Sequence, residues 1–285
     1  MLLKKIAVVL CSALLLPLAA GEKILFKDGD SVAFMGDSIT NYGWSRPGGY
    51  IRLTVEALKD AGINISVIPA GVSANKSTDM HARLKRSVIS KKPVWMTLSC
   101  GVNDVWHTKG VGLDEYKKEV TAIVDECEAA GIKVIILTPT MITENPAYGH
   151  NKKLGLYCDW LRAFAKERDL PLADLHAEMI RTVTAAKEEA EKNGTPRRIY
   201  TRDGVHMNHL GDQMMATGLL RALGVSGERI EKVRRNVWDH LPAAENKVHL
   251  SNLELQAMEK LCNERGIKAA DFIRECVLKE LKINK

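Results

Sequence analysis

Residues 31–40 read SVAFMGDSIT, a β-type apolar run that passes directly into a Gly-Asp-Ser turn. The chain repeats this design, because short β-rich runs alternate with longer segments in which apolar residues recur every three or four positions. The expected strands are residues 31–35, 64–69, 94–98, 133–137 and 170–174. The clearest helical patterns lie at 113–130 and 151–169. Since strands that alternate with helices form a parallel sheet covered on both faces, the sequence predicts an α/β domain.

Glycines mark the ends of several expected helices. Gly62, Gly131 and Gly224 each follow a helical pattern at the position where a left-handed cap is common. We therefore expect the α/β domain to extend to about residue 224.

The composition limits the function classes. The chain has 285 residues, 46% hydrophobic and 27% charged, which is ordinary for a globular protein with one large domain and a small appendage. Its formal net charge is +6, and two of these charges belong to Lys4 and Lys5. No lysine or arginine cluster marks the main body, so the charge pattern predicts no nucleic-acid partner.

Five cysteines follow the N-terminal segment: Cys100, Cys127, Cys158, Cys262 and Cys276. They show no Cys-x-x-Cys spacing, so the sequence predicts no zinc or redox motif. An odd number leaves at least one thiol free. The pairing of the others stays open, because an exported protein is permitted disulfides.

The first twenty residues have the features of a secretory signal. Lys4 and Lys5 precede an uncharged run over 6–16, and small residues close the segment at Ala19 and Ala20. The run is shorter than the roughly 20 apolar residues of a membrane span, so we expect cleavage near Ala20 and export to the periplasm or the outside of the cell. The alternative is an anchor that stays uncleaved. No other stretch of the sequence is long and apolar enough to span a bilayer.

Polar motifs follow the expected strands. They are Gly-Asp-Ser at 36–38, Ala-Gly at 70–71, Gly-Val-Asn-Asp at 101–104 and, just before a late helical pattern, Asp-Gly-Val-His at 203–206. In open parallel sheets, ligands gather at the carboxyl ends of the strands. We therefore expect the four motifs to meet on one rim of the sheet.

These motifs contain the parts of a serine hydrolase. A hydroxyl needs a neighbouring base, usually histidine, which an acid holds in one tautomer. Ser38 and His206 supply the hydroxyl and the base, and Asp203 is close enough in sequence to accept the imidazole Nδ1 proton. The oxyanion formed during acyl transfer needs rigid donors. Candidate donors are the backbone N–H groups of Ser38 and Gly71 and the side-chain amide of Asn103.

Each motif alone has a structural interpretation, since Gly-Asp-Ser is a common turn tripeptide. Together, in this order, they resemble the SGNH (GDSL) hydrolase family, which is named after a Ser, a Gly, an Asn and a His in four blocks. The resemblance covers about residues 30–224 and implies a flavodoxin-like three-layer α/β/α sandwich that hydrolyses esters and related acyl bonds without a cofactor. It also implies Ser38 as nucleophile and first oxyanion donor, Gly71 and Asn103 as the other donors, His206 as base and Asp203 as its orienting acid.

Two positions depart from the usual pattern of that family. Ile39 replaces the leucine that commonly follows Gly-Asp-Ser, and Met207 stands where many members carry proline or leucine. Neither change touches the groups that carry the chemistry.

Other chemistries match the sequence less well. Residues 71–75, GVSAN, lack the last glycine of a Gly-x-Ser-x-Gly elbow, so Ser73 is a weak rival to Ser38. No phosphate-binding loop is present in the sequence. The spacing of the candidate acids and His206 does not match a dedicated metal cage, so no metal is expected, and a metal-dependent phosphoesterase is only a formal alternative.

Further histidines and aromatic residues have open roles. His81, His107, His150, His176 and His209 are expected at the surface or on helix faces rather than as ligands. Trp106 and His107 follow the Asn103 motif closely enough to line a pocket, or they pack within the loop. Tyr42 and Trp44 form either a flat wall for a sugar ring or part of the packing under their loop.

The C-terminal part has a different pattern. A charged connector at 228–235 leads through Trp238 to two helical stretches, 252–264 and 269–282, with a soft boundary near residue 240. We therefore assign 21–240 to the catalytic domain and 241–285 to a helical appendage. The appendage weakly resembles ribbon-helix-helix repressor modules, but DNA binding conflicts with export. A helical hairpin that packs on the catalytic domain, or that forms a dimer contact, fits better.

The sequence thus predicts an exported serine esterase that removes a short acyl group, with an O-acetyl ester of a carbohydrate as the preferred substrate. Only four phenylalanines and no long apolar insertion for a lipid lid support this preference. A lysophospholipase, thioesterase or arylesterase uses the same residues. A glycan-binding protein without turnover and a DNA-associated protein are the alternatives from other classes. The sequence makes no prediction of oligomeric state.

Overall fold

The structure of the protein, a computed structural model, describes residues 22–193, 199–240 and 252–280. The chain divides into two compact units, Met1–Ala244 and Glu245–Lys285. The expected signal segment lies outside the described residues, so its cleavage stays a prediction. Among the helices of the described ranges, none is long and apolar enough to cross a membrane.

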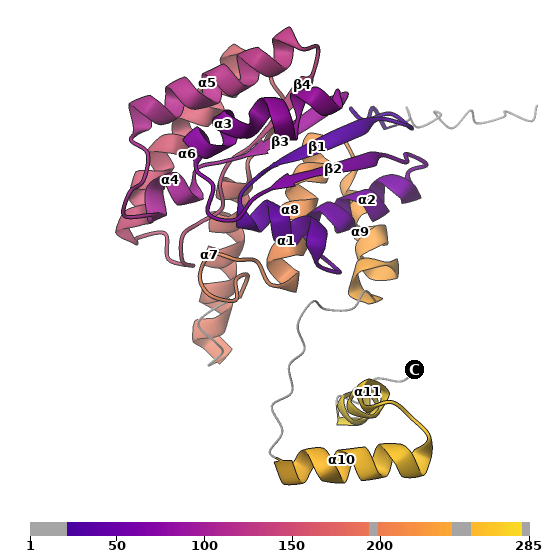
Figure 1. The fold of residues 1–285 in the computed structure, drawn as a ribbon. Helices are drawn as coiled ribbons and strands as arrows, with labels where there is room; N and C mark the ends of the chain where they lie inside the picture. Colours follow the sequence, from indigo (N-terminus) through magenta and orange to yellow (C-terminus); the bar gives the residue numbers. More distant parts are fainter. Residues whose placement is uncertain (1–21, 194–198, 241–251, 281–285) are drawn as a thin grey trace, which may run out of the picture. The chain divides into compact units, whose positions relative to one another are not determined.

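A parallel five-stranded sheet forms the centre of the first unit (Figure 1). The strands are β1 (Ser31–Gly36), β2 (Ser66–Gly71), β3 (Trp95–Ser99), β4 (Lys133–Leu137) and β5 (Leu172–Ala173). Their order is β2-β1-β3-β4-β5, and every neighbouring pair is parallel. This is the flavodoxin-like order, in which the chain reverses direction across the sheet between β1 and β3. The fold predicted from the sequence is confirmed.

Helices cover both faces of the sheet (Figure 1). One face carries α3 (Ser77–Ser87), α5 (Leu113–Ala129) and α6 (Gly149–Glu167). The other carries α2 (Tyr50–Asp60), α8 (His209–Ala222) and α9 (Gly227–Asn236). Three further helices, α1 (Ser38–Ser45), α4 (Val102–Trp106) and α7 (Leu175–Asn193), follow β1, β3 and β5 along the chain. Because both faces are covered, residues 32–35 of β1 are all fully buried, which explains their continuous apolar run.

The element boundaries agree closely with the sequence prediction. The limits of β4 coincide with it, and β1, β2 and β3 shift by one or two residues. The edge strand β5 is shorter than expected, because Pro171 has no N–H to donate and only β4 pairs with it. Gly62, Gly131 and Gly224 have φ angles of 78°, 73° and 89°, as expected for left-handed helix caps.

The charged segment 228–235 was expected as a connector, and this expectation is wrong because the segment is helical and packed. It lies within α9, whose Ile230 and Val233 are buried. Beyond the helix, the Trp238 indole N–H donates to the Leu53 carbonyl oxygen of α2 at 3.1 Å. Only two apolar side chains of α9 face the domain, so the sequence lacks the repeated apolar positions that would predict a helix here.

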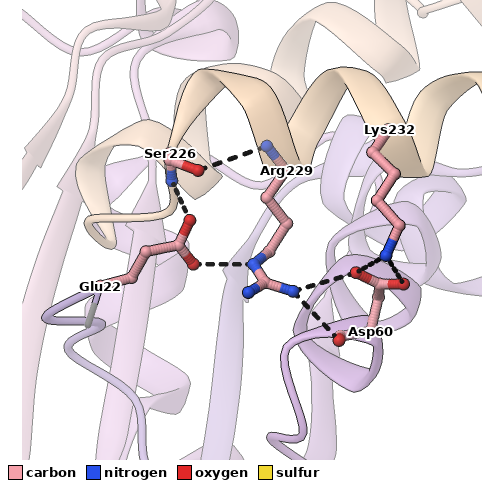
Figure 2. Close-up of polar contacts among 5 residues, drawn as sticks. All are labelled: Glu22, Asp60, Ser226, Arg229 and Lys232. Atoms are coloured by element: carbon pink, nitrogen blue, oxygen red, sulfur yellow. Dashed lines mark hydrogen bonds and ion pairs between the residues drawn. The ribbon is translucent and has the colours of Figure 1, made fainter. Parts of the chain in front are cut away.

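An ion-pair network fixes α9 to the first described residues (Figure 2). The Arg229 guanidinium donates to Glu22 at 2.7 Å and to Asp60 at 3.1 Å. Lys232 lies 3.2 Å from the same Asp60 carboxylate, and Ser226 N–H donates to Glu22. The network therefore joins the first described residues, the end of α2 and helix α9.

The second unit contains α10 (Asn252–Arg265) and α11 (Ala269–Glu280). Gly266 takes a φ of 65° at the turn between them. The Arg265 guanidinium lies 5.6 Å from the Phe272 ring centre, which joins the two helices. The expected helical pair is present. The short run before α10, on which the repressor resemblance depends, lies outside the described residues.

All five cysteines of the described ranges are free thiols. Four of them are buried and Cys276 is exposed. Burial raises the pKa of the Cys127 thiol to about 12, so it is protonated and behaves as a small apolar side chain.

Candidate active site

The Gly-Asp-Ser turn joins the end of β1 to the start of α1. Asp37 is the N-cap of this helix, and its Oδ1 accepts the Ile39 N–H at 2.8 Å. Ser38 is therefore the first helical residue and is 9% exposed at the carboxyl end of the sheet. Burial raises the pKa of the Asp37 carboxyl to about 6.

A hydrogen-bonded chain connects Ser38, His206 and Asp203. Ser38 Oγ lies 2.9 Å from His206 Nε2, and His206 Nδ1 lies 2.5 Å from Asp203 Oδ2. With the ring proton on Nδ1, the histidine donates to the carboxylate and presents a lone pair to the serine hydroxyl. The structure thus brings Ser38 into contact with His206, which lies 168 positions later in the chain.

The Asp203 carboxylate is oriented by its own turn. Its Oδ1 accepts the N–H groups of Val205 at 3.0 Å and His206 at 2.8 Å. Partial burial acts to raise the pKa of Asp203, but the hydrogen bonds from the His206 ring and from these two backbone groups lower it to about 2. The group is therefore an anion at any pH near neutrality.

Two glycines of the site are required by close packing. A Cβ atom on Gly36 would lie 2.0 Å from Thr40 Oγ1, and one on Gly71 would lie 2.3 Å from the Asn41 backbone nitrogen. Neither residue has a positive φ, so these glycines serve close approach rather than an unusual backbone conformation. Gly71 thereby lies directly against the first turn of α1.

The Gly71 peptide faces away from β1. Gly36 and Gly71 are register partners, and the Gly36 carbonyl accepts from Val72 N–H at 3.0 Å. In a parallel ladder this pattern leaves the N–H and C=O of the partner residue on the opposite side. There the Gly71 carbonyl accepts from the Asn41 side chain at 3.2 Å.

Asn103 lies in α4 and is buried. Its Nδ2 donates to the Asn75 carbonyl oxygen at 3.0 Å and lies 3.4 Å from Asp37 Oδ2. The amide is therefore held near the Gly-Asp-Ser turn. The roles of Ser38, Gly71 and Asn103 as oxyanion donors stay predictions.

The neighbouring Asp104 has a structural environment. It is buried, and its Oδ1 accepts from the backbone N–H of Ser77 at 3.0 Å and from the Ser77 hydroxyl at 2.5 Å. Burial raises the pKa of this carboxyl. Asp104 thus connects the start of α3 to α4.

The rival candidates are not assembled into a comparable site. Ser73 is exposed, and no histidine of the described residues bonds to it. Those residues also contain no group of three or more His, Cys, Asp or Glu side chains that could hold a metal ion.

The other histidines lie on helices or at the surface, as expected. His176 is only 5% exposed, because it lies on the inner side of α7. His81 is partly exposed between Glu119 and Glu126. His107 and His209 are exposed, as the sequence predicted.

Aromatic side chains differ in their relation to the site. The Tyr42 ring lies edge-on to the His206 ring, 5.2 Å between centres, and the Arg46 guanidinium stacks 3.8 Å above Tyr42. Trp44 instead packs against the core under Arg52. Trp106, at the end of α4, is 44% exposed. Tyr42 is thus the aromatic residue in contact with the base.

Two charged residues near the site escaped the sequence prediction. Glu144 is buried and accepts hydrogen bonds from the segment that precedes Asp203. Arg83 is buried and donates to carbonyl oxygens beside Gly71 and Asp37. No local signal in the sequence identifies either residue, because charged side chains usually face solvent.

Comparison with known proteins assigns the family. A model of the GDSL-like lipase/acylhydrolase family matches residues 34–214, which include all the candidate site residues. The chain belongs to this family. As a GDSL-like hydrolase, it has the fold and the motif order that the sequence resemblance implied.

Curated and solved relatives agree with the assignment. This hydrolase is 29% identical to an acetylxylan esterase of Geobacillus stearothermophilus, over 69% of this chain and 94% of the relative. The structure of that enzyme matches with 26% identity and a TM-score of 0.62, over 71% of this chain and 98% of the other. A second acetyl xylan esterase structure, AlAXEase, matches with 32% identity and a TM-score of 0.60, over 67% and 98% of the two chains.

Solved variants of the Geobacillus enzyme bear on its chemistry. Three of its structures are catalytic mutants in which a serine, an aspartate or a histidine is replaced by alanine. The substituted aspartate and histidine are three residues apart in that enzyme. Asp203 and His206 have the same separation in this chain.

Proposed function

We propose that this GDSL-like hydrolase is an exported carbohydrate esterase that removes O-acetyl groups through an acyl-enzyme on Ser38. The observation that carries the proposal is the chain of contacts from Ser38 Oγ to His206 Nε2, at 2.9 Å, and from His206 Nδ1 to Asp203, at 2.5 Å. The acetylxylan esterases among its relatives support a polysaccharide ester as the substrate. Export rests on the signal-like first twenty residues.

The reaction proceeds in two halves. Ser38 Oγ bonds to the acetyl carbon while its proton moves to His206 Nε2, and the carbonyl electrons move to the oxygen. The tetrahedral intermediate then collapses, the bond to the sugar oxygen breaks, and His206 returns the proton to the departing alkoxide. A water molecule repeats these steps on the acyl-enzyme, which releases acetate and restores Ser38.

The side chains around the serine have complementary tasks in this scheme. Asp203, with a pKa of about 2, holds the imidazole and stabilises the imidazolium without taking its proton. The N–H groups of Ser38 and Gly71 and the Asn103 amide receive the oxyanion. A helix start holds the Ser38 N–H and close packing holds the Gly71 N–H. One N–H of the Asn103 amide bonds to the Asn75 carbonyl, and the other, which lies 3.4 Å from Asp37 Oδ2, is the one that turns to the oxyanion.

The mechanism is tested with Ser38→Ala and His206→Ala on a chromogenic acetyl ester, together with labelling by a serine-directed phosphonate. Both variants should lose at least about 1,000-fold in kcat, and Ser38→Ala should lose labelling. Full turnover by Ser38→Ala contradicts the proposal. Absence of turnover in the wild type on every ester would favour the glycan-binding alternative.

The substrate class needs a separate comparison. Acetylated xylan and xylo-oligosaccharides should be deacetylated faster than lysophospholipids, acyl thioesters or long-chain aryl esters. A preference for a lipid or a thioester would replace the carbohydrate assignment while leaving the serine mechanism intact. N-terminal sequencing of the exported protein tests cleavage near Ala20, and an intact leader on exported protein would contradict it.

A further inference from the structure

A buried arginine lies behind the candidate oxyanion donors. Arg83 projects inward from α3 and is only 8% exposed. Its Nη2 donates to the carbonyl oxygens of Gly36 and Ala70, both at 2.9 Å, and its Nε donates to Asn75 Oδ1 at 2.5 Å. Among the described residues, no carboxylate is a hydrogen-bond partner of Arg83. A buried cation without an ion-pair partner is costly, so its position requires an explanation.

The contact with the Ala70 carbonyl connects Arg83 to one candidate oxyanion donor, the Gly71 N–H. The Ala70 carbonyl and the Gly71 N–H belong to the same planar peptide unit, whose two ends polarise together. A guanidinium on the carbonyl oxygen therefore strengthens the N–H as a donor. It also fixes the plane of the peptide, which decides where the Gly71 N–H points.

The contact with the Asn75 side chain connects Arg83 to another candidate donor, the Asn103 amide. Arg83 holds the Asn75 side chain, and the Asn75 backbone carbonyl accepts from Asn103 Nδ2 at 3.0 Å. Arg83 is thus connected to both Gly71 and Asn103 through the partners that it bonds to. Its third partner, the Gly36 carbonyl, lies directly before the Asp37-Ser38 turn.

We propose that Arg83 is a positioning residue that holds and polarises the oxyanion-binding groups of Gly71 and Asn103. The inference rests on the proposed function, because an oxyanion forms only if Ser38 attacks an acyl carbonyl. A fixed positive charge behind the donors favours the state in which negative charge develops on the substrate oxygen. The ground-state ester carries no such charge, so the effect belongs to the transition state.

A positioning role of Arg83 and a role in the fold alone have different kinetic effects. Loss of transition-state stabilisation lowers kcat and leaves KM nearly unchanged. It also weakens an inhibitor that forms a charged tetrahedral adduct on the serine. A purely structural residue instead lowers the fraction of competent enzyme, and each competent molecule keeps its normal kcat.

The experiment compares Arg83→Met and Arg83→Lys with the wild type. Methionine keeps much of the side-chain volume without the charge, and lysine keeps the charge but cannot form the three-way fork. Arg86→Met is the matched control, since Arg86 is exposed on the same helix. Competent sites are counted by phosphonate titration of Ser38. For each protein, kcat and KM on a chromogenic acetyl ester and the Ki of methylboronic acid are then measured.

The expected result is a specific loss per competent site. Removing a direct oxyanion donor costs about 100-fold to 1,000-fold in kcat, so a residue acting through the donors should cost about 10-fold to 100-fold. Arg83→Met should lose this much in kcat and a similar factor in boronic acid affinity, with KM within about 2-fold of the wild type. Arg83→Lys should lose about 5-fold or more. Arg86→Met should match the wild type.

Other outcomes overturn the inference. Normal kcat per titrated site in Arg83→Lys, or a loss in KM alone, would make the residue structural. A fall in kcat without a parallel fall in boronic acid affinity would equally contradict a role at the oxyanion. If Arg83→Met does not fold, Arg83→Lys decides the question. Failure of the proposed function is recognised separately, because Ser38→Ala would then retain activity and phosphonate would not label the wild type.

Discussion

The carboxylate of Glu144 accepts hydrogen bonds from both the backbone N–H and the hydroxyl of Thr201, each at 2.7 Å. It also accepts the N–H groups of Ile199, at 2.6 Å, and Tyr200, at 2.9 Å. Residues 199–208 form a narrow loop, closed by a bridge between Thr201 and Met207. Glu144 therefore anchors the base of the loop that carries Asp203 and His206.

Thr143, the residue before Glu144, holds the tip of the same loop. Thr143 N–H donates to the Gly204 carbonyl oxygen at 2.6 Å. Thr143 takes a φ of 62°, which is unusual for a β-branched residue and indicates local strain. Two consecutive residues thus fix the base and the tip of the loop, so the position of His206 depends on a segment beyond β4.

Glu144→Gln should impair catalysis through the loop that carries Asp203 and His206. Glutamine keeps one carbonyl acceptor but places an amide donor against backbone N–H groups, which costs about 1–3 kcal/mol of unfolding free energy. We expect kcat and the rate of phosphonate labelling to fall together, by about 10-fold, because the His206 base is misplaced. Glu167→Gln, at an exposed position of α6, is the control and should change neither quantity. Normal labelling in Glu144→Gln would show that the loop holds itself.

Gly71→Ala should damage the site through a single methyl group. The new Cβ would lie 2.3 Å from the Asn41 nitrogen, so α1 and the end of β2 must move apart. We expect kcat to fall by about 100-fold or more, because the Ser38 and Gly71 donors shift relative to each other. Steady-state kinetics after titration of competent sites measures this loss.

Gly155→Ala provides the contrast for that substitution. Gly155 lies inside α6, and a Cβ there would meet nothing within 4 Å. Alanine should therefore raise the free energy of unfolding by about 0.5–1 kcal/mol through helix propensity, with unchanged kcat. If Gly71→Ala behaved like Gly155→Ala, the close approach of Gly71 to α1 would not matter for catalysis.

The sequence was sufficient for the parts of the site that are local. The Gly-Asp-Ser turn and the Asp203 to His206 pair each fall within a few residues, where residue types and spacing determine the contacts. The parallel sheet then follows from the alternation of strands and helices, and it brings these motifs to one rim.

The two charged residues that escaped prediction each have a partner at a long separation along the chain. Arg83 bonds to Gly36 across 47 positions, and Glu144 to Thr201 across 57. Charged side chains usually face solvent, so nothing in their neighbours distinguishes a buried one. The burial of His176 was equally hidden, because a polar residue on an inner helix face has no sequence signal of its own. Substrate preference is equally hidden, since it depends on a surface assembled from several loops.

Asp203→Asn should lower kcat/KM by about the same factor at pH 8 and at pH 9. The pKa of Asp203 is about 2 in the folded protein, below the usual value, so the carboxylate is ionised throughout this range. Asparagine fits the other tautomer of His206 and removes the lone pair that Ser38 needs, which costs about 100-fold to 10,000-fold. The ratio of wild-type to variant kcat/KM should therefore be flat between pH 8 and pH 9.

A ratio near one at pH 8 would contradict the assignment, because Asp203 would then not be the group that orients the His206 ring. The same low pKa has a consequence for stability. The stabilising contribution of this carboxylate is present above its unfolded pKa of about 3.9 and is lost as the pH falls through about 2.

His81 should stabilise the protein in a pH-dependent way without any part in catalysis. Its Nδ1 lies 2.6 Å from Glu119 and its Nε2 3.0 Å from Glu126, so a protonated ring bridges α3 to α5. Partial burial acts to lower the pKa of His81, but the hydrogen bonds with Glu126 and Glu119 raise it above its ordinary value. The stabilisation is therefore complete below the unfolded pKa of about 6.5 and is lost as the pH rises through the folded value.

His81→Gln tests this sign directly. Chemical denaturation at pH 5.5 should show a loss of about 0.5–1.5 kcal/mol in the free energy of unfolding, and the loss should shrink by pH 9 because the wild-type ring is then neutral. His107→Gln, at an exposed position, controls for general effects of replacing a histidine. A loss that grows with pH would mean that the neutral ring, rather than the imidazolium, joins the two helices.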